Sequence, residues 1–298
     1  MIKIIAEAGI AHCGRVEDAI KLVNAAHAAD ADVVKFQLYH TDQLVRDVPN
    51  WGPLKSCELT PREHERVKQH CDAIGIEWMA SCFDTDAVDL AIQLGAKTIK
   101  VGSGEIVNHD LLHYIARTGK HLLLSTGAAT MIEVDLAVQV FDHANPEKPW
   151  EKLSLLHCVS AYPASFEDCN LLAMFALKRR FWLRPVGFSD HTIGFDAAVA
   201  AVGVGAEIIE RHIMLAPGCP DEAVSFTPET FRGYVATIRR AERMMGNGVK
   251  QPTAAELKIR DDIRYRWHVP PDRTSGRETA ELGEGYTLGG PAGVGKAP

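Results

Sequence analysis

Two histidines and a glutamate have a spacing that could form a metal site. His191, in the stretch VGFSDHTIGF, and His212, in IIERHI, are 21 residues apart, about the length of one strand–helix unit. If each histidine ends a strand, the two strands are neighbours about 4.8 Å apart, and both imidazoles could bind one ion. Glu7 would join them if the sheet closed on itself. Such a ligand set suits Mn²⁺, Fe²⁺ or Zn²⁺, while the same spacing also fits hydrogen-bonded core histidines without a metal.

A second polar group could bind an anion. The stretch KVGSGE (100–105) combines a lysine, a serine and a glutamate with two glycines, and Ser125 and Ser189 end other apolar runs. Ammonium, hydroxyl and backbone N–H groups are good phosphate ligands. The alternative is that the glycines only shape a turn and that Lys100 neutralises a glutamate. Since a buried ammonium needs a partner, we favour an anionic, phosphorylated substrate beside a metal.

The elements that must position these residues form a regular series. Eight nearly continuous apolar runs alternate with helical patterns, which is typical of parallel strands covered on both faces. The series predicts an α/β fold, a TIM (β/α)8 barrel, over residues 1–250. An open doubly wound sheet is the alternative, but no G-x-G-x-x-G turn follows a strand. The predicted strands are 3–9, 32–37, 76–81, 98–103, 121–126, 153–159, 184–190 and 207–213, and the predicted helices are 16–29, 61–74, 85–94, 108–118, 130–143, 168–178, 195–204 and 228–245.

Every predicted strand ends in polar residues. In a TIM barrel the active site lies at the C-terminal ends of the strands. A fold that needed only a core would not require polar side chains at all eight ends, so the pattern predicts an enzyme. Residues 251–298 are predicted to form a C-terminal helix and a flexible Gly/Pro-rich tail.

Composition limits the classes of partner and compartment. The 298 residues are 46% hydrophobic and 24% charged, with a formal net charge of −7 and dispersed lysines and arginines. We therefore expect no nucleic-acid partner. No run of about 18 apolar residues occurs, so no membrane association is expected. The seven scattered cysteines form no C-x-x-C pair, which predicts a reduced, cytoplasmic chain.

Several stretches together resemble the sialic acid synthase family, the N-acetylneuraminate synthases that condense phosphoenolpyruvate with an N-acyl sugar aldehyde. They occur in the family order from residue 3 to about residue 245. Several such stretches in order are far more specific than any one of them. The matching stretches are AEAGIAHCG, ADVVKFQ, IKVGSGEI, LLLSTGAAT, LHCVSAYPASFEDCNL, VGFSDHTIG and IIERHI.

The resemblance implies a TIM barrel with a divalent metal, usually manganese, that acts as a Lewis acid. It implies His191 and His212 as metal ligands and Glu7 as a catalytic group near the reacting carbons. Carbon 3 of phosphoenolpyruvate would attack the aldehyde, water would capture carbon 2, and phosphate would leave. The resemblance implies the following phosphoenolpyruvate-site residues: Lys100 and Tyr162, which would also be catalytic, with Ser103, Ser125 and Ser189. Gln37 and Glu105 match sugar-side or structural positions.

The sequence also departs from the family pattern. Cys82 replaces a threonine that contacts phosphoenolpyruvate, and Ser160 stands where an asparagine is common. The loop after the second histidine is shortened but keeps an acid at Asp221. No C-terminal antifreeze-like domain is recognisable, although the resemblance still implies a homodimer. These departures fall mainly on the sugar side, which leaves the aldehyde open.

Two other functions stay open. One is a metal-dependent hydrolase or lyase on the same barrel, which would act on a single substrate and ignore phosphoenolpyruvate. The other is a non-catalytic relative that binds a sugar acid. The polar residues at the strand ends favour the condensing synthase, which would make a sialic acid or another nonulosonic or 3-deoxy-ulosonic acid.

Overall fold

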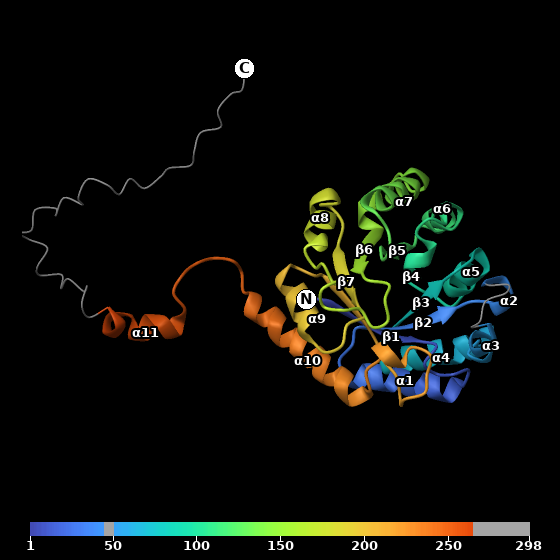
Figure 1. Ribbon diagram of the computed structural model, residues 1–298, viewed down its shortest axis with the longest axis horizontal. Coiled ribbons are helices and arrows are strands. Elements are labelled where there is room, and N and C mark those ends of the chain that lie inside the picture. Colours follow the sequence, from blue (N-terminus) through green and yellow to red (C-terminus); the bar gives the residue numbers. More distant parts are fainter. Residues whose placement is uncertain (45–50, 265–298) are drawn as a thin grey trace, which may run out of the picture. The chain divides into compact units, whose positions relative to one another are not determined.

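The protein folds into a closed barrel of parallel strands surrounded by helices (Figure 1). The computed structural model describes residues 1–44 and 51–264. Each strand pairs with the next along the chain, and the last pairs with the first. The predicted TIM barrel is therefore confirmed. The strands are β1 (Lys3–Gly9), β2 (Val33–Leu38), β3 (Glu77–Cys82), β4 (Thr98–Val101), β5 (His121–Ser125), β6 (Leu153–Cys158), β7 (Val186–Asp190) and β8 (Ile208–His212).

Helices follow the strands and cover the outside of the barrel (Figure 1). The eight predicted helices are present within a few residues of their expected ends, except that α8 begins later than predicted. Two short helices, α2 and α3, were not predicted. The helices are α1 (Val16–Ala28), α2 (Thr41–Leu44), α3 (Trp51–Ser56), α4 (Pro61–Ile74), α5 (Thr85–Gln93), α6 (His109–Arg117), α7 (Met131–Ala144), α8 (Ala173–Arg180), α9 (Asp196–Gly203), α10 (Pro228–Met245) and α11 (Ala254–Ile263), with 3-10 turns η1 (Ser103–Glu105), η2 (Pro149–Glu151) and η3 (Glu222–Val224).

Local sequence signals explain where several helices begin. Thr60 before α4 and Thr130 before α7 each form a capping box with the glutamate three residues later. The threonine oxygen accepts an N–H group of the first turn, and the glutamate accepts the threonine N–H. Gly75 ends α4 in the left-handed conformation, with φ of 83°, which glycine adopts at little cost.

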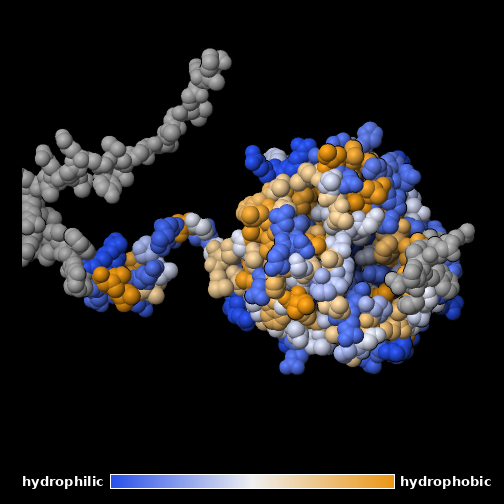
Figure 2. All heavy atoms as spheres, viewed as in Figure 1, coloured by the Kyte–Doolittle hydropathy of each residue, from blue (hydrophilic) through white to orange (hydrophobic). Residues whose placement is uncertain are grey.

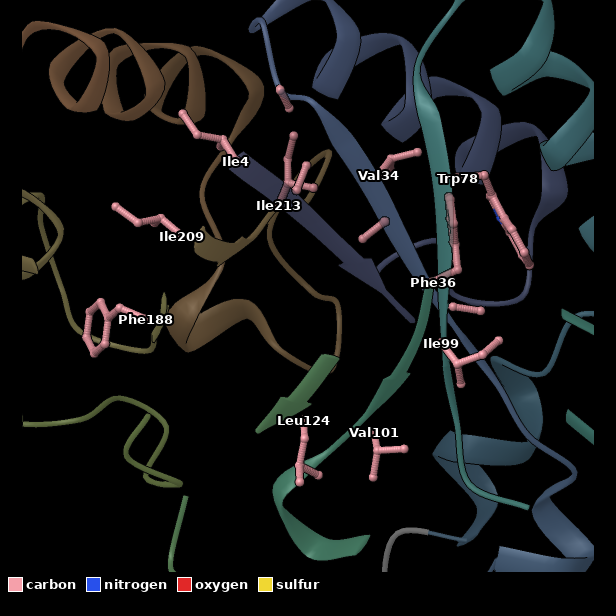
Figure 3. Packing of buried hydrophobic residues seen from close by; sticks show 14 of the residues in the cluster. Ile4, Val34, Phe36, Trp78, Ile99, Val101, Leu124, Phe188, Ile209 and Ile213 are labelled. Atoms are coloured by element: carbon pink, nitrogen blue, oxygen red, sulfur yellow. The ribbon is translucent and has the colours of Figure 1, made fainter. Parts of the chain in front are cut away.

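Alternate residues of each strand face the surrounding helices and form the main core. Figure 3 shows Ile4, Phe36, Trp78, Ile99 and Phe188 among the side chains of this layer. All five are almost fully buried and belong to one hydrophobic cluster. Because side chains alternate across a strand, the intervening residues must face the barrel interior, where the polar groups lie.

The barrel interior is built in layers. A small apolar cluster crosses it, formed by Ile5, Val33, Met79, Leu123, Leu156 and Ile208. Two residues further along the same strands, the inward side chains become polar, with Glu7 after Ile5 and Lys35 after Val33. We call the six apolar residues the barrel plug. The plug forms the floor beneath the polar residues at the C-terminal end.

The surface of the barrel unit mixes polar and apolar residues (Figure 2). On the face shown, apolar side chains gather over α7 and α8, where Ile132 is 72% and Phe175 is 53% exposed. Among the described residues, none of the helices combines the length and the apolar composition needed to cross a membrane.

The chain divides into two compact units, residues 1–246 and 247–298. The first contains the whole barrel, from β1 to α10. The second contains α11, which begins with a capping box formed by Thr253 and Glu256. The predicted Gly/Pro-rich tail lies outside the described residues.

Candidate functional site

A cavity of about 230 Å³ opens at the C-terminal ends of the strands. Seven of the strands, all except β6, contribute lining residues. Most of these residues carry charged, amide, hydroxyl or imidazole groups, so the cavity suits a polar ligand. The lining residues are Glu7, Lys35, Gln37, Ser81, Phe83, Lys100, Gly102, Ser103, Gly104, Ser125, Tyr162, Ser189, His191, Glu210 and His212.

A buried cluster of charges occupies the base of this cavity. The Nζ atom of Lys35 lies 2.8 Å from Oε2 of Glu7 and 2.6 Å from Oε2 of Glu210. All three side chains are at most 5% exposed. The strand register explains the contacts, because Glu7 of β1 pairs with Lys35 of β2 on one side and with His212 of β8 on the other. A buried charge cluster of this kind costs desolvation energy, which makes it a strong candidate for chemistry.

Burial and neighbouring charges set the protonation of the cluster. Burial lowers the pKa of Lys35 to about 7, although Glu210 acts in the opposite direction. Burial acts to raise the pKa of Glu210, but Lys35 and Lys100 outweigh it and hold that pKa well below its usual range. Glu210 also accepts a hydrogen bond of 2.9 Å from the Ser189 hydroxyl. The cluster therefore pairs an ionised carboxylate with a lysine that can lose its proton near neutral pH.

Glu7 has an oxygen atom free to act on a ligand. Its Oε1 atom is buried and has no hydrogen-bond partner among the described residues. The β1–β2 register shifts between Glu7 and Gly9, and Gly9 has φ of 50°. A β-carbon at Gly9 would lie 3.0 Å from Oε1 of Glu7. Glycine at this bulge therefore leaves room for the glutamate to reach into the cavity.

The two histidines and Tyr162 form the wall beside the charge cluster. The ring centroids of His191 and His212 are 5.6 Å apart, and Tyr162 stacks on His191 at 4.3 Å. The Nδ1 atom of His191 lies 2.7 Å from the carbonyl oxygen of Val159, so Nδ1–H donates and Nε2 keeps its lone pair. Burial lowers the pKa of both histidines, and the repulsion of His191 adds to the effect at His212. Both rings are therefore neutral near pH 7.

Neutral imidazoles with a free lone pair are suitable metal ligands. Asp221, in the loop after β8, lies beside the pair, with its Oδ2 atom 3.6 Å from Nδ1 of His212. Burial raises the pKa of Asp221. Within residues 1–44 and 51–264, no group of three or more His, Cys, Asp or Glu residues has the arrangement of a metal site. Among the residues that the structure describes, His191 and His212 are therefore the pair that could hold a metal.

The residues predicted to bind an anion lie on another wall of the cavity. Lys100, Ser103 and Ser125 all line the cavity. The Oγ atom of Ser103 accepts a 3.0 Å hydrogen bond from the N–H of Gly127 and lies 3.2 Å from Sγ of Cys158. The Nζ atom of Lys100 donates to the carbonyl oxygen of Val101 at 3.1 Å. An ammonium has three donors, so Lys100 can also donate to an anionic ligand in the cavity.

Most of the predicted residues lie in or next to the cavity, but Cys82 and Glu105 do not line it. Cys82 is fully buried in the main core because it follows Ser81 in the strand and faces the opposite side; Ser81 lines the cavity instead. Glu105 lies outside the cavity lining, and its carboxylate accepts a 2.8 Å hydrogen bond from the Asn108 side chain. Ser160, though not in the lining, has its hydroxyl beside that of Ser103, next to Gly127.

Lys35 and Glu210 are the central residues that sequence analysis did not select. Both are charged residues inside runs of apolar strand residues, VVKFQ and IIERH. A charge at an inward position of a buried strand is itself a signal, because an unpaired charge there would be costly. Applying the two-residue period from Gln37 and from His212 would have identified both.

A larger cavity, of about 690 Å³, opens at the other end of the barrel. The plug residues Ile5, Met79, Leu123 and Ile208 form part of its lining, and Lys3 pairs with Glu77 beside it. Size alone would favour this cavity. The N-terminal end of a TIM barrel, however, is the end that serves stability, and the buried charges and paired histidines all lie at the C-terminal end.

A closed parallel barrel with converging polar groups at the strand ends defines a TIM-barrel enzyme. The family model that matches the chain, over residues 22–250, is that of the NeuB family. The chain therefore belongs to the NeuB family, and it is an enzyme of the synthase type. The resemblance found in the sequence is confirmed.

Relatives and solved structures agree with this assignment. The N,N'-diacetyllegionaminic acid synthase of Legionella pneumophila is 38% identical over 296 residues, covering 93% of this chain and 83% of that protein. The N-acetylneuraminate-9-phosphate synthase of Homo sapiens is 30% identical over 276 residues, covering 87% and 76%. The crystal structure of the N-acetylneuraminic acid synthetase of Leptospira borgpetersenii serovar Hardjo-bovis, in complex with citrate, has a TM-score of 0.81 and 31% identity, covering 89% of this chain and 91% of that one.

Proposed function

We propose that the protein condenses phosphoenolpyruvate with an N-acyl sugar aldehyde to give a nonulosonic acid and phosphate, and that it uses a divalent metal, most simply Mn²⁺. One observation carries the proposal. A single cavity combines a lysine and hydroxyls that suit a phosphate, two ionisable glutamates that flank a lysine, and two neutral histidines.

The anion-binding wall supports phosphoenolpyruvate as one substrate. Lys100, Ser103 and Ser125 come from or follow two neighbouring strands, β4 and β5. Lys100 supplies the charge, and the serines supply hydroxyl donors to the phosphate oxygens. Holding the phosphate in place orients the enol carbon toward the second substrate, and such positioning supplies much of the rate.

The histidine wall supports the metal. His191 and His212 would hold the cation, and Asp221 lies close enough to accept a hydrogen bond from a water bound beside it. A divalent cation bound there would supply Lewis acidity toward the aldehyde carbonyl. Tyr162, stacked on His191, covers the ring from solvent and orients it.

The charge cluster supports proton transfer at the reacting carbons. The condensation forms one carbon–carbon bond and turns the aldehyde oxygen into a hydroxyl, which must gain a proton. Water adds to carbon 2 and must lose a proton as phosphate leaves. Glu7 has a buried oxygen without a partner that could accept this proton. The Nζ atom of Lys35 lies 2.8 Å from the other oxygen of the same carboxylate.

The relatives support an N-acylated aldehyde as the other substrate. The two relatives described above are named for different N-acylated acids, legionaminic and neuraminic. Gln37 lines the cavity and is part-exposed, which places an amide where it could contact the sugar.

The experiment measures phosphate release from phosphoenolpyruvate with and without Mn²⁺, across N-acyl hexosamines, diacetamido sugars and simple aldoses. We expect release that requires both an aldehyde and Mn²⁺, that EDTA abolishes, and that His191→Ala reduces at least 100-fold. His70→Ala is the matched control, because His70 lies outside the cavity lining, is only part-buried and contacts the Asn24 side chain.

Two results would contradict the proposal. Phosphate release that needs no aldehyde would indicate hydrolysis in place of condensation. Full activity in metal-free protein would remove the metal from the reaction.

A further inference from the structure

The side chain of Arg211 lies behind the two histidines, on the outer face of the barrel wall. It is 1% exposed and is among the largest fully buried side chains. Arg211 precedes His212 in β8 and pairs in register with Asp190 of β7, which precedes His191. Because side chains alternate across a strand, the arginine and aspartate face the helices while Ser189 and Glu210 face the cavity.

Arg211 holds the backbone on both sides of His191. Its Nη1 atom donates to the carbonyl oxygen of Asp190 at 3.2 Å and to that of Thr192 at 2.5 Å. These are the residues immediately before and after His191. The same nitrogen lies 3.2 Å from Oδ1 of Asp190. One guanidinium therefore fixes the turn whose tip carries the histidine.

The Asp190 carboxylate completes this turn. Its Oδ1 atom accepts hydrogen bonds from the Thr192 N–H at 2.9 Å and from the Thr192 hydroxyl at 2.7 Å. Its Oδ2 atom accepts a 2.8 Å hydrogen bond from the hydroxyl of Tyr234 in α10. Asp190 and Thr192 are both 0% exposed, so no solvent competes for these bonds.

The same group also contacts the strand end that carries His212. The guanidinium carbon of Arg211 lies 3.7 Å from the centre of the Phe226 ring. The backbone N–H of Phe226 donates to the carbonyl oxygen of His212 at 3.0 Å. Arg211 therefore connects, through direct contacts, the backbone beside His191 and the segment bonded to His212. We call Arg211, Asp190, Thr192, Tyr234 and Phe226 the rear brace.

Stability alone is a poor explanation for the rear brace. Apolar residues of similar volume often replace a buried ion pair without loss of stability. The Nε atom of Arg211 is buried and has no hydrogen-bond partner among the residues that the structure describes, which is a further cost. Arg211 is a buried charge with these costs, and it contacts the segments of both histidines. This combination indicates that the arginine serves to hold the two segments in a fixed geometry.

We propose that Arg211 is a positioning residue that fixes the separation and orientation of His191 and His212, so that both rings can bind one cation. The inference rests on the proposed function, since it concerns the metal pair of that site. It also adds a residue that lies outside the cavity and touches no substrate.

The test compares Arg211→Met and Arg211→Lys with a matched control, Arg184→Met. Arg184 is also a buried arginine, which pairs with Asp142 at 2.6 Å and donates to the carbonyl oxygen of Pro149 at 3.0 Å, and it lies outside the cavity lining. Mn²⁺ affinity is measured by electron paramagnetic resonance, and the exchange of the Thr192 amide by hydrogen–deuterium exchange of the metal-free protein. Melting temperatures are recorded for all variants.

We expect Arg211→Met to weaken Mn²⁺ binding at least tenfold and to speed exchange at Thr192. Arg211→Lys should keep the affinity within about threefold of the wild type, since an ammonium can still donate to carbonyl groups. Arg184→Met should lower the melting temperature without changing either readout. Unchanged Mn²⁺ affinity in Arg211→Met, with a melting temperature as low as that of Arg184→Met, would show a merely structural role and overturn the inference.

The two proposals fail separately. If the wild type binds no Mn²⁺ and releases no phosphate, the proposed function is wrong. The inference is then decided by the imidazole chemical shifts of His191 and His212 in metal-free protein, which Arg211→Met should move and Arg184→Met should not. If the wild type binds Mn²⁺ and Arg211→Met binds it equally well, only the inference is wrong.

Discussion

Gly127 provides a sharp test of the anion-binding wall. A β-carbon at this position would lie 2.3 Å from Oγ of Ser160, 2.8 Å from Oγ of Ser103 and 2.9 Å from Sγ of Cys158. All three distances are shorter than a carbon atom tolerates, so Gly127→Ala must displace these groups. The backbone of Gly127 is not in the left-handed region, which means that any effect comes from crowding.

The size of the effect follows from which atoms move. The crowded atoms are the ends of short side chains, which can rotate away, so we expect a loss of about 1–2 kcal/mol in the free energy of unfolding. The Ser103 hydroxyl, however, would leave its place in the cavity wall. Losing a phosphate contact worth about 1.4 kcal/mol weakens binding tenfold. We therefore expect KM for phosphoenolpyruvate to rise by at least tenfold.

The assay is steady-state phosphate release beside urea unfolding, with Gly203→Ala as the control. Gly203 also lies outside the left-handed region, and a β-carbon there would meet nothing within 4 Å. The control should keep its KM and its stability within about 0.5 kcal/mol. An unchanged KM for phosphoenolpyruvate in Gly127→Ala would refute the placement of Ser103 at the phosphate.

Three other predictions test the site and its surroundings. Lys35→Met should lower the free energy of unfolding in urea by about 3–5 kcal/mol, because it leaves buried carboxylates without their partner. In the control Lys3→Met, the ion pair that is lost is partly exposed, so the loss should be less than about 1 kcal/mol. Equal losses would contradict the buried cluster. Ser81→Ala should raise KM for phosphoenolpyruvate and Cys82→Ala should not, since only Ser81 faces the cavity; the reverse order would restore Cys82 to the site. Burial lowers the pKa of His12 to about 4, so below pH 6.5 the unfolded chain binds more protons than the folded protein. The free energy of unfolding should therefore fall by up to about 3 kcal/mol between pH 6.5 and 4. His12→Gln should flatten that part of a stability–pH curve, and an unaltered curve would show that His12 is not the cause.

The strands and most helices were predictable because their signals are local. Nearly continuous apolar runs such as HLLLS of β5 have few alternatives to a buried parallel strand. The short helix α3 was missed because its sequence, WGPLKS, contains glycine and proline, which ordinarily interrupt helices. Tertiary contacts, which no local pattern reports, hold it: the Tyr39 hydroxyl donates to the carbonyl oxygen of Leu54 at 2.8 Å, and Leu54 packs against Ile10, Tyr39 and Cys57.

The site was predictable where the residue type and the strand end coincide. His191, His212 and Lys100 stand at such ends, and the structure brings all three to one cavity. Cys82 was misassigned because the prediction relied on its position in a family motif and ignored the two-residue alternation of side chains along the strand. Glu105 was predicted to occupy a sugar-side or structural position, and its hydrogen bond with Asn108 beside a 3-10 turn fits the structural alternative.

The barrel plug makes the cavity a well with one opening. Ile5, Val33 and the four other apolar side chains close the barrel below the charge cluster, so neither water nor reactants cross from the other end. Whatever binds deepest, beside Lys35 and Lys100, must enter before the molecule above it and leave after it. If phosphoenolpyruvate binds deepest, as its proposed contact with Lys100 suggests, the closed floor predicts that it binds before the sugar and that the acid product leaves before phosphate.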